Sequence, residues 1–167
     1  MSGRISILMY HQVGIFPAMK AHRANYCDHR RFRRQMALLH WPRVPVLDMD
    51  AVLACQRGER PTPPLAVART FDDAYANFVD YAMPVLEQFR FPATVYAISD
   101  WLGRRAEWFA KDPGRPVPNL MSARQLQEVR AAGIAVGSHT ACHVKLAEVT
   151  PDVQRRELES SKASLED

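Results

Sequence analysis

Short apolar runs and stretches of helical period alternate along this chain. Four runs have the length of buried β-strands, and they span residues 5–10, 65–71, 93–98 and 134–136. Between them, apolar residues recur every three or four positions, which is the period of an amphipathic helix. Strands that alternate with helices favour right-handed βαβ units and a parallel sheet, so we expect the α/β class.

Polar residues that cap helices mark three of the helical stretches. Asp28 precedes an apolar stripe over residues 29–40, and Asp48 precedes a shorter helix. Ser122 and Gln125 have the spacing of a capping box. We therefore expect helices to begin directly after Asp28, Asp48 and Ser122.

Two further helical stretches contain proline near their beginning or middle. From Tyr75 onward apolar residues have helical spacing, but Pro84 should break or kink this helix or begin a new turn. A last helix is expected to begin at Thr150-Pro151. Its thin apolar stripe consists of Val153, Leu158 and Leu165.

Three segments between these elements are expected to be loops: residues 14–26, 57–64 and 103–120. The third contains three prolines together with Trp108 and Phe109. A loop of this length in a compact domain is usually functional or mobile.

The composition is that of an ordinary soluble globular domain. The chain has 167 residues, of which 47% are hydrophobic and 24% charged, enough for one core. Its net charge of +4 is mild and compatible with anionic glycans or nucleic acid without implying either. The three cysteines (Cys27, Cys55 and Cys142) have no paired spacing, so reduced thiols are expected rather than a disulfide framework.

Four arginines give the helix over residues 29–40 a basic face: Arg30, Arg31, Arg33 and Arg34. No aromatic stacking platform or nucleic-acid motif accompanies them, so a solvated helix face is favoured and no nucleic-acid partner is expected. The first ten residues lack the pattern of a signal peptide, and no apolar stretch has the length of a membrane span. A cytoplasmic location is the expectation that follows.

Metal-ligating side chains follow two of the predicted strands. Asp72 and Asp73 come directly after residues 65–71, and His139 and His143 come after residues 134–136. In parallel sheets functional groups collect at the carboxyl ends of strands. One carboxylate and two imidazoles are a common ligand set of catalytic zinc, which keeps a position open for water. The alternative is a turn with a helix cap and two surface histidines, but two such halves at strand ends favour a metal site with a second, free carboxylate.

Residues 70–74 and 139–144 resemble the first two motifs of the NodB-type polysaccharide deacetylases (carbohydrate esterase family 4). Those motifs run Thr-Phe-Asp-Asp-Gly and His-Ser/Thr-x-x-His-Pro. Here Ala74 replaces the glycine of the first and Val144 the proline of the second. Residues 7–11 resemble the opening strand of the family's poly-N-acetylglucosamine deacetylase branch, and residues 91–96 and 157–162 also fit the resemblance. The resemblance thus covers nearly the whole chain.

The resemblance implies metal-dependent hydrolysis of N-acetyl groups on amino sugars within a polysaccharide, with a role in cell-envelope or exopolysaccharide processing. By motif position, Asp73, His139 and His143 are expected to hold the metal and Asp72 to act as general base. Zinc is expected first, with cobalt and nickel as alternatives. His11, at the end of residues 5–10, and Tyr75 are candidate substrate contacts; a hydrogen-bonded histidine and a buried aromatic are the structural alternatives.

The family's barrel has more strands than this sequence contains, and its later motifs, one of which supplies a histidine as general acid, do not occur before Asp167. We therefore expect residues 1–167 to be a single NodB-like domain, the N-terminal portion of a distorted (β/α) barrel. An open sheet edge then favours self-association. The alternative function is a catalytically impaired metal-binding relic of the same fold that acts as a binding or assembly module.

Overall fold

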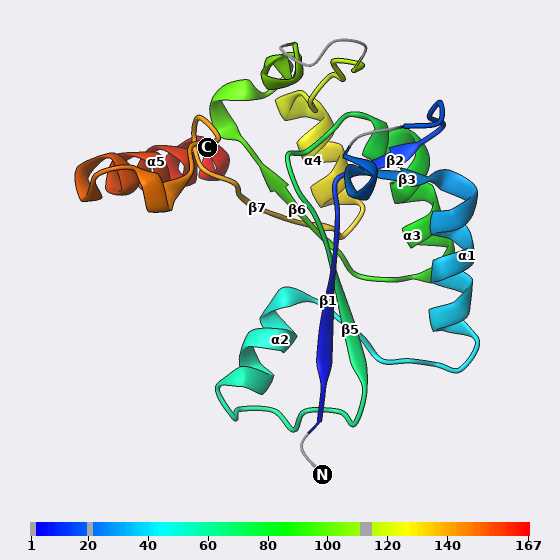
Figure 1. Cartoon of the computed structure of the whole chain (residues 1–167). Helices are drawn as coiled ribbons and strands as arrows, with labels where there is room; N and C mark the ends of the chain where they lie inside the picture. Colours follow the sequence, from blue (N-terminus) through cyan, green and yellow to red (C-terminus); the bar gives the residue numbers. More distant parts are fainter. Residues whose placement is uncertain (1–2, 20–21, 111–114) are drawn as a thin grey trace.

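The main sheet confirms the predicted α/β class. The structure, a computed structural model, describes residues 3–19, 22–110 and 115–167. Its strands β1 (Ile5–Tyr10), β5 (Ala66–Phe71), β6 (Thr94–Ala97) and β7 (Ala135–Ser138) pair in the order β1-β5-β6-β7, and every pair is parallel (Figure 1). Among the described residues the sheet stays open and does not close into a barrel.

Strand β5 is the centre of this sheet, and all six of its residues are buried. One edge pairs with β1 along its whole length. The other edge pairs first with β4 (Val46–Leu47) and then with β6. The sequence did not predict β4, because two apolar residues are too few to show a period.

The described residues include five α-helices. They are α1 (His29–His40), α2 (Met49–Gln56), α3 (Met83–Phe89), α4 (Ala123–Ala131) and α5 (Pro151–Glu166). Four of them, α1, α2, α4 and α5, begin where the sequence predicts. The Asp28 carboxylate accepts hydrogen bonds from two backbone amides at the start of α1. The capping box of α4 is complete: Ser122 Oγ accepts from the Gln125 amide at 3.3 Å, and Gln125 Oε1 accepts from the Ser122 amide at 3.0 Å. Within the described ranges, none of the helices combines the length and hydropathy that crossing a membrane requires.

The helix expected from Tyr75 begins later than predicted. A π-helical turn, η2 (Phe78–Ala82), comes first, and α3 then begins with Pro84 in its first turn. Pro84 lacks an amide hydrogen, so it cannot continue a regular helix but suits the start of one. Tyr75 instead forms an antiparallel bridge with Leu120.

Two predicted loops contain short structure. Gln12–Gly14 (β2) and Tyr26–Asp28 (β3) pair in parallel at the ends of the first loop, with the 3₁₀ turn η1 (Arg23–Asn25) before β3. The long loop of residues 103–120 contains the 3₁₀ turn η4 (Glu107–Phe109); residues 111–114 of that loop and residues 20–21 of the first lie outside the described part.

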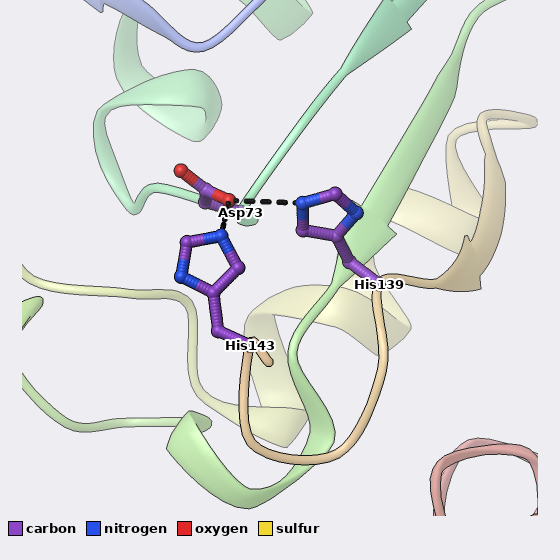
Figure 2. A group of neighbouring side chains, drawn as sticks. All are labelled: Asp73, His139 and His143. Atoms are coloured by element: carbon purple, nitrogen blue, oxygen red, sulfur yellow. Dashed lines mark ion pairs between the residues drawn. The ribbon is translucent and has the colours of Figure 1, made fainter. Parts of the chain in front are cut away.

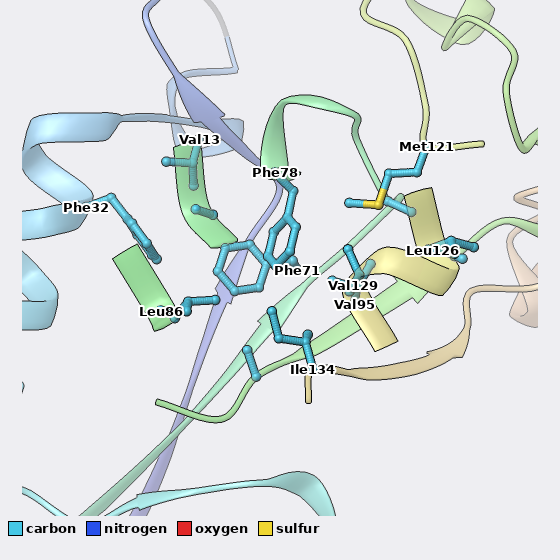
Figure 3. Close-up of a cluster of buried hydrophobic side chains, with 14 of the residues drawn as sticks. Val13, Phe32, Phe71, Phe78, Leu86, Val95, Met121, Leu126, Val129 and Ile134 are labelled. Atoms are coloured by element: carbon cyan, nitrogen blue, oxygen red, sulfur yellow. The ribbon is translucent and has the colours of Figure 1, made fainter. Parts of the chain in front are cut away.

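The main core lies between one face of the sheet and helices α1, α3 and α4 (Figure 3). Phe71 of β5 is at its centre, with the ring centroids of Phe78 at 4.7 Å and Tyr10 at 5.2 Å. The buried guanidinium of Arg69 donates to the Pro92 carbonyl at 2.9 Å and lies 4.4 Å from the Phe91 ring centroid. This packing fixes the carboxyl end of β5, where Asp72 follows.

The opposite face of β1 is less covered. Because side chains alternate along a strand, Ile5, Ile7 and Met9 share this face. Ile5 packs against the small cluster beneath α2, but Ile7 is 50% exposed and Met9 60% exposed. The open sheet therefore leaves apolar surface in contact with solvent.

Candidate metal centre

The candidate ligands lie at the carboxyl ends of β5 and β7, on either side of β6. The Asp72 amide donates to the Tyr10 carbonyl at 2.9 Å, and the His139 amide donates to the Ala97 carbonyl at 2.8 Å. These bonds extend the sheet pairing by one residue beyond each strand end. Asp73 and His139, 66 positions apart in sequence, are thereby brought to one edge of the sheet.

Three side chains converge at this edge. Figure 2 shows the imidazoles of His139 and His143 directed at the carboxylate of Asp73. The Asp73 Oδ1 atom lies 3.3 Å from Nε2 of His139 and 3.3 Å from Nε2 of His143, and the three groups offer ligand atoms within 4.8 Å of one another. Tetrahedral zinc with bonds of about 2.0–2.1 Å separates its ligand atoms by roughly 3.3 Å. The spacing therefore fits one small divalent ion.

Asp73 is suited to be the anionic ligand. Its side chain is buried, and Oδ1 has no hydrogen-bond partner among the described residues. Burial alone raises the pKa of Asp73, but the polar contacts of His139 and Tyr75 and the imidazole charges outweigh it, so the pKa lies below its usual value. A buried, ionised oxygen without a hydrogen bond is an atom that a cation satisfies.

The two imidazoles have different electrostatic environments. Contact with Asp73 raises the pKa of His139 although burial opposes it. Burial lowers the pKa of His143, with the Asp73 charge opposing. Neutral imidazole is the form that ligates a metal, and His143 is therefore the ligand more readily available in that form.

Asp72 lies beside the three candidate ligands and is not a member of that group. It is half-buried, and burial raises the pKa of its carboxyl group; the charges of His139 and His11 oppose this shift. His11 follows β1 and interacts electrostatically with both Asp72 and His143. The structure thus brings His11 and Asp72 to the same site as the three candidate ligands.

Strained backbone surrounds the site. Asp73, Ala74, Thr140 and His143 all have φ between +52° and +70°, a left-handed conformation that costs non-glycine residues about 1–2 kcal/mol. Ala74 stands where the resembling motif has glycine, the residue that adopts this conformation without strain. Such strain persists only where the surrounding structure fixes the backbone.

Aromatic side chains form one wall of the site. The Trp108 ring centroid lies 4.8 Å from that of His143, and Trp101 packs edge-on against Trp108. Tyr75 is 1% exposed and stacks on Phe109, so its ring lies inside this cluster. Burial and the neighbouring charge of Asp73 raise the pKa of Tyr75. Substrate contacts by His11 and Tyr75 stay predictions.

A buried carboxylate that we did not single out from the sequence also reaches the site. Glu157 of α5 accepts hydrogen bonds from the amides of Ala141 and Cys142, between the two histidines. Ser161, one helical turn further on, is also buried. The signal in the sequence was the i, i+4 spacing of two polar residues, which the apolar stripe predicted for this helix obscured.

A protein-family model matches the larger part of this sequence. The family model described as "Polysaccharide deacetylase" matches residues 59–167, which include all four candidate site residues of the two motifs. This chain belongs to the polysaccharide deacetylase family. The resemblance inferred from the two motifs is therefore confirmed.

Two relatives of known sequence cover different shares of the chain. The Bacillus subtilis protein YxkH, whose name places it among polysaccharide deacetylases, is 26% identical over 160 residues, or 95% of this chain and 50% of its own. The poly-beta-1,6-N-acetyl-D-glucosamine N-deacetylase of Escherichia coli K12 is 30% identical over 111 residues, or 65% of this chain and 16% of its own. This chain spans half or less of the length of these curated relatives.

A solved structure supports the fold. The deacetylase PplD of Streptococcus pyogenes, determined in complex with acetate, superposes with a TM-score of 0.79 at 24% identity. The match covers 100% of this chain and 71% of that one. At this identity the likeness shows that the two chains share the NodB-type fold.

Proposed function

We propose that this family member is the metal-binding part of a polysaccharide N-deacetylase, which hydrolyses acetamido groups on amino sugars. The observation that carries the proposal is the convergence of Asp73, His139 and His143 at 3.3 Å, with a second carboxylate beside them. In this proposal those three residues hold one divalent ion, with zinc preferred over cobalt or nickel.

The donor set and its spacing support zinc binding. One carboxylate oxygen and two imidazole nitrogens are three protein ligands, the number found in catalytic zinc sites, whereas structural zinc sites have four. A bound divalent ion supplies a Lewis acid that polarises an amide carbonyl and lowers the pKa of water. Asp73, buried and with a lowered pKa, offers the negative charge that retains such an ion.

Asp72 is the proposed general base. It is not needed as a ligand, and its carboxylate lies among the imidazoles of His139, His143 and His11. Burial raises its pKa, which makes it a better proton acceptor than an exposed carboxylate. In the proposed reaction the water oxygen bonds to the acetyl carbon as Asp72 takes a proton from the water. The amide carbon–nitrogen bond then breaks as the sugar nitrogen accepts a proton, which gives acetate and an amine on the sugar.

The proposed substrate is a polymer of N-acetylglucosamine. This proposal draws on the name of the Escherichia coli relative, which is 30% identical over 111 residues of this chain. The aromatic wall of Trp108 and Trp101 beside His143 supports it, because sugar rings stack on aromatic faces. His11, half-buried beside Asp72, is the proposed polar contact to the glycan.

An acetate-release assay tests this function. The chain is incubated with N-acetylglucosamine oligomers, β-1,6-linked and chitin-type in parallel, with zinc, with cobalt and with chelator. Acetate release that depends on metal and is lost in Asp72→Asn supports the proposal, and release that persists in chelator contradicts it. The alternative, a metal-binding relic that acts as a binding or assembly module, predicts stoichiometric metal and no acetate.

A further inference from the structure

The loop that carries both imidazoles is strained and needs support. Thr140 has a φ of +68° and His143 a φ of +64°. Two side chains within the loop stabilise it: Ser138 Oγ accepts from the Thr140 amide at 3.2 Å, and Thr140 Oγ1 accepts from the His143 amide at 3.0 Å. The backbone amides of Ala141 and Cys142, which lie between Thr140 and His143, take no part in these two bonds and need other acceptors.

One side of the loop is fixed by the segment that follows β6. The 3₁₀ turn η3 (Ser99–Trp101) directs two backbone amides at the loop. The Ser99 amide donates to the Thr140 carbonyl at 3.3 Å, and the Asp100 amide donates to the Ala141 carbonyl at 3.1 Å. The carbonyl groups of the loop are thereby satisfied from the sheet side.

The other side is fixed by α5 through a single carboxylate. Oε2 of Glu157 accepts from the Ala141 amide at 3.0 Å and from the Cys142 amide at 2.8 Å. Glu157 is only 5% exposed. Hydrogen bonds to an ionised acceptor are roughly twice as strong as neutral ones, and successive amides form a natural cradle for an anion. This carboxylate thus satisfies the two amides midway between the metal-ligating histidines.

A second contact places α5 in the same register. Ser161 lies one turn after Glu157 on the same face of the helix, is fully buried, and has its Oγ 2.7 Å from Oγ of Ser138. Leu158, by contrast, is 48% exposed, so the helix buries its polar pair and exposes part of its expected apolar stripe. The face of α5 that meets the site is therefore built for hydrogen bonding to the loop.

We propose that Glu157 is a positioning residue of the metal centre. Its carboxylate holds the backbone between His139 and His143 so that both imidazoles are directed at Asp73 before a metal binds. The inference rests on the proposed metal site and extends it. Glu157 is not one of the three candidate ligands and acts on them through the loop. Without Glu157, metal binding itself has to order the loop. Part of the binding free energy is then used for this ordering, and the affinity for the metal falls.

Three variants test the proposal through zinc affinity, measured by competition with a chromophoric chelator. In Glu157→Ala we expect affinity to fall about 10–100-fold, the usual effect of removing a group that orients ligands. Glu157→Gln keeps an oxygen that accepts from both amides, so most of the affinity should return. Glu159→Ala removes an exposed carboxylate from the same helix and should retain the parental affinity.

Amide hydrogen exchange in the metal-free protein gives a readout that does not require metal. The Ala141 and Cys142 amides should exchange faster in Glu157→Ala than in the parent or in Glu159→Ala. If the parent chain binds no metal, the proposed function fails, while this exchange still shows whether Glu157 holds the loop.

Parental zinc affinity in folded Glu157→Ala overturns the proposal, whatever exchange shows. If circular dichroism shows that Glu157→Ala does not fold, Glu157→Asp takes its place. This variant keeps the charge but withdraws the carboxylate by one methylene, and it should also bind zinc more weakly. Parental affinity in that variant equally overturns the proposal.

Discussion

Adjacent carboxylates at the end of β5 have opposite electrostatic properties. The pKa of Asp73 is lowered, because contacts with His139 and Tyr75 outweigh burial. The pKa of Asp72 is raised, chiefly by burial. One residue is therefore suited to bind a cation and its neighbour to accept a proton, a division that the turn after β5 permits because successive side chains point in different directions.

We expect Asp72→Asn to keep the metal and lose hydrolysis. The amide cannot accept the proton, and a positioned base contributes typically about 10²–10⁴-fold to the rate. Zinc content and acetate release are measured on the same preparations. The control variant is Asp152→Asn, which changes an exposed carboxylate. Loss of zinc in Asp72→Asn would mean that the roles of the two carboxylates have been exchanged.

The residues of the candidate site were predictable, but the conformations that support them were not. Asp73, His139 and His143 follow strand ends, and parallel pairing alone brings them to one edge. Nothing in residue type predicts that Asp73, Ala74 and His143 adopt positive φ, because tertiary contacts fix these conformations. Glu157 was missed because the apolar stripe predicted for α5 obscured its i, i+4 spacing with Ser161, and residue type does not show that its partners are backbone amides.

Among the elements, helices with a side-chain cap were predicted most closely. The first residues of α1, α2 and α4 agree with the positions of Asp28, Asp48 and Ser122, because a cap is a local hydrogen bond that neighbouring residues determine. The predicted start of α3, Tyr75, was wrong by eight positions. Apolar residues with helical spacing occur there before the regular helix begins. A π-turn that depends on packing fills part of the difference.

Replacing Ser122 with alanine should destabilise the chain by about 0.5–2 kcal/mol, the usual cost of losing an N-cap. The variant removes the oxygen that accepts from the Gln125 amide. Urea unfolding followed by circular dichroism gives the free energy of unfolding. Gln127→Ala, at an exposed position of the same helix, is the control and should lie within about 0.5 kcal/mol of the parent. Equal midpoints for both variants would refute the role of the cap.

In the whole molecule, β1 is an edge strand of the sheet among the described residues, and part of one of its faces is exposed. Ile7 and Met9 expose half or more of their surface on that face. Exposed apolar faces and unpaired strand edges favour association. That residues 1–167 form the N-terminal portion of one domain stays a prediction, and so does a cytoplasmic location.

We expect two copies of the chain to associate through this exposed face of β1. Analytical ultracentrifugation should show a sedimentation coefficient that rises with concentration, and Ile7→Lys combined with Met9→Lys should shift the equilibrium toward monomer. Leu38→Lys replaces an apolar residue that is 72% exposed on α1 and should leave the association unchanged. A parent chain that remains monomeric at every concentration would contradict this expectation.

Elemental analysis of zinc-loaded, dialysed protein shows whether Asp73, His139 and His143 form a metal centre. We expect one zinc per chain in the parent and near-complete loss in His139→Ala, because the two remaining ligands would hold the ion too weakly to survive dialysis. His40→Ala removes an exposed histidine at the end of α1 and should retain the metal. Equal zinc content in the parent and in His139→Ala would show that these residues do not hold the metal.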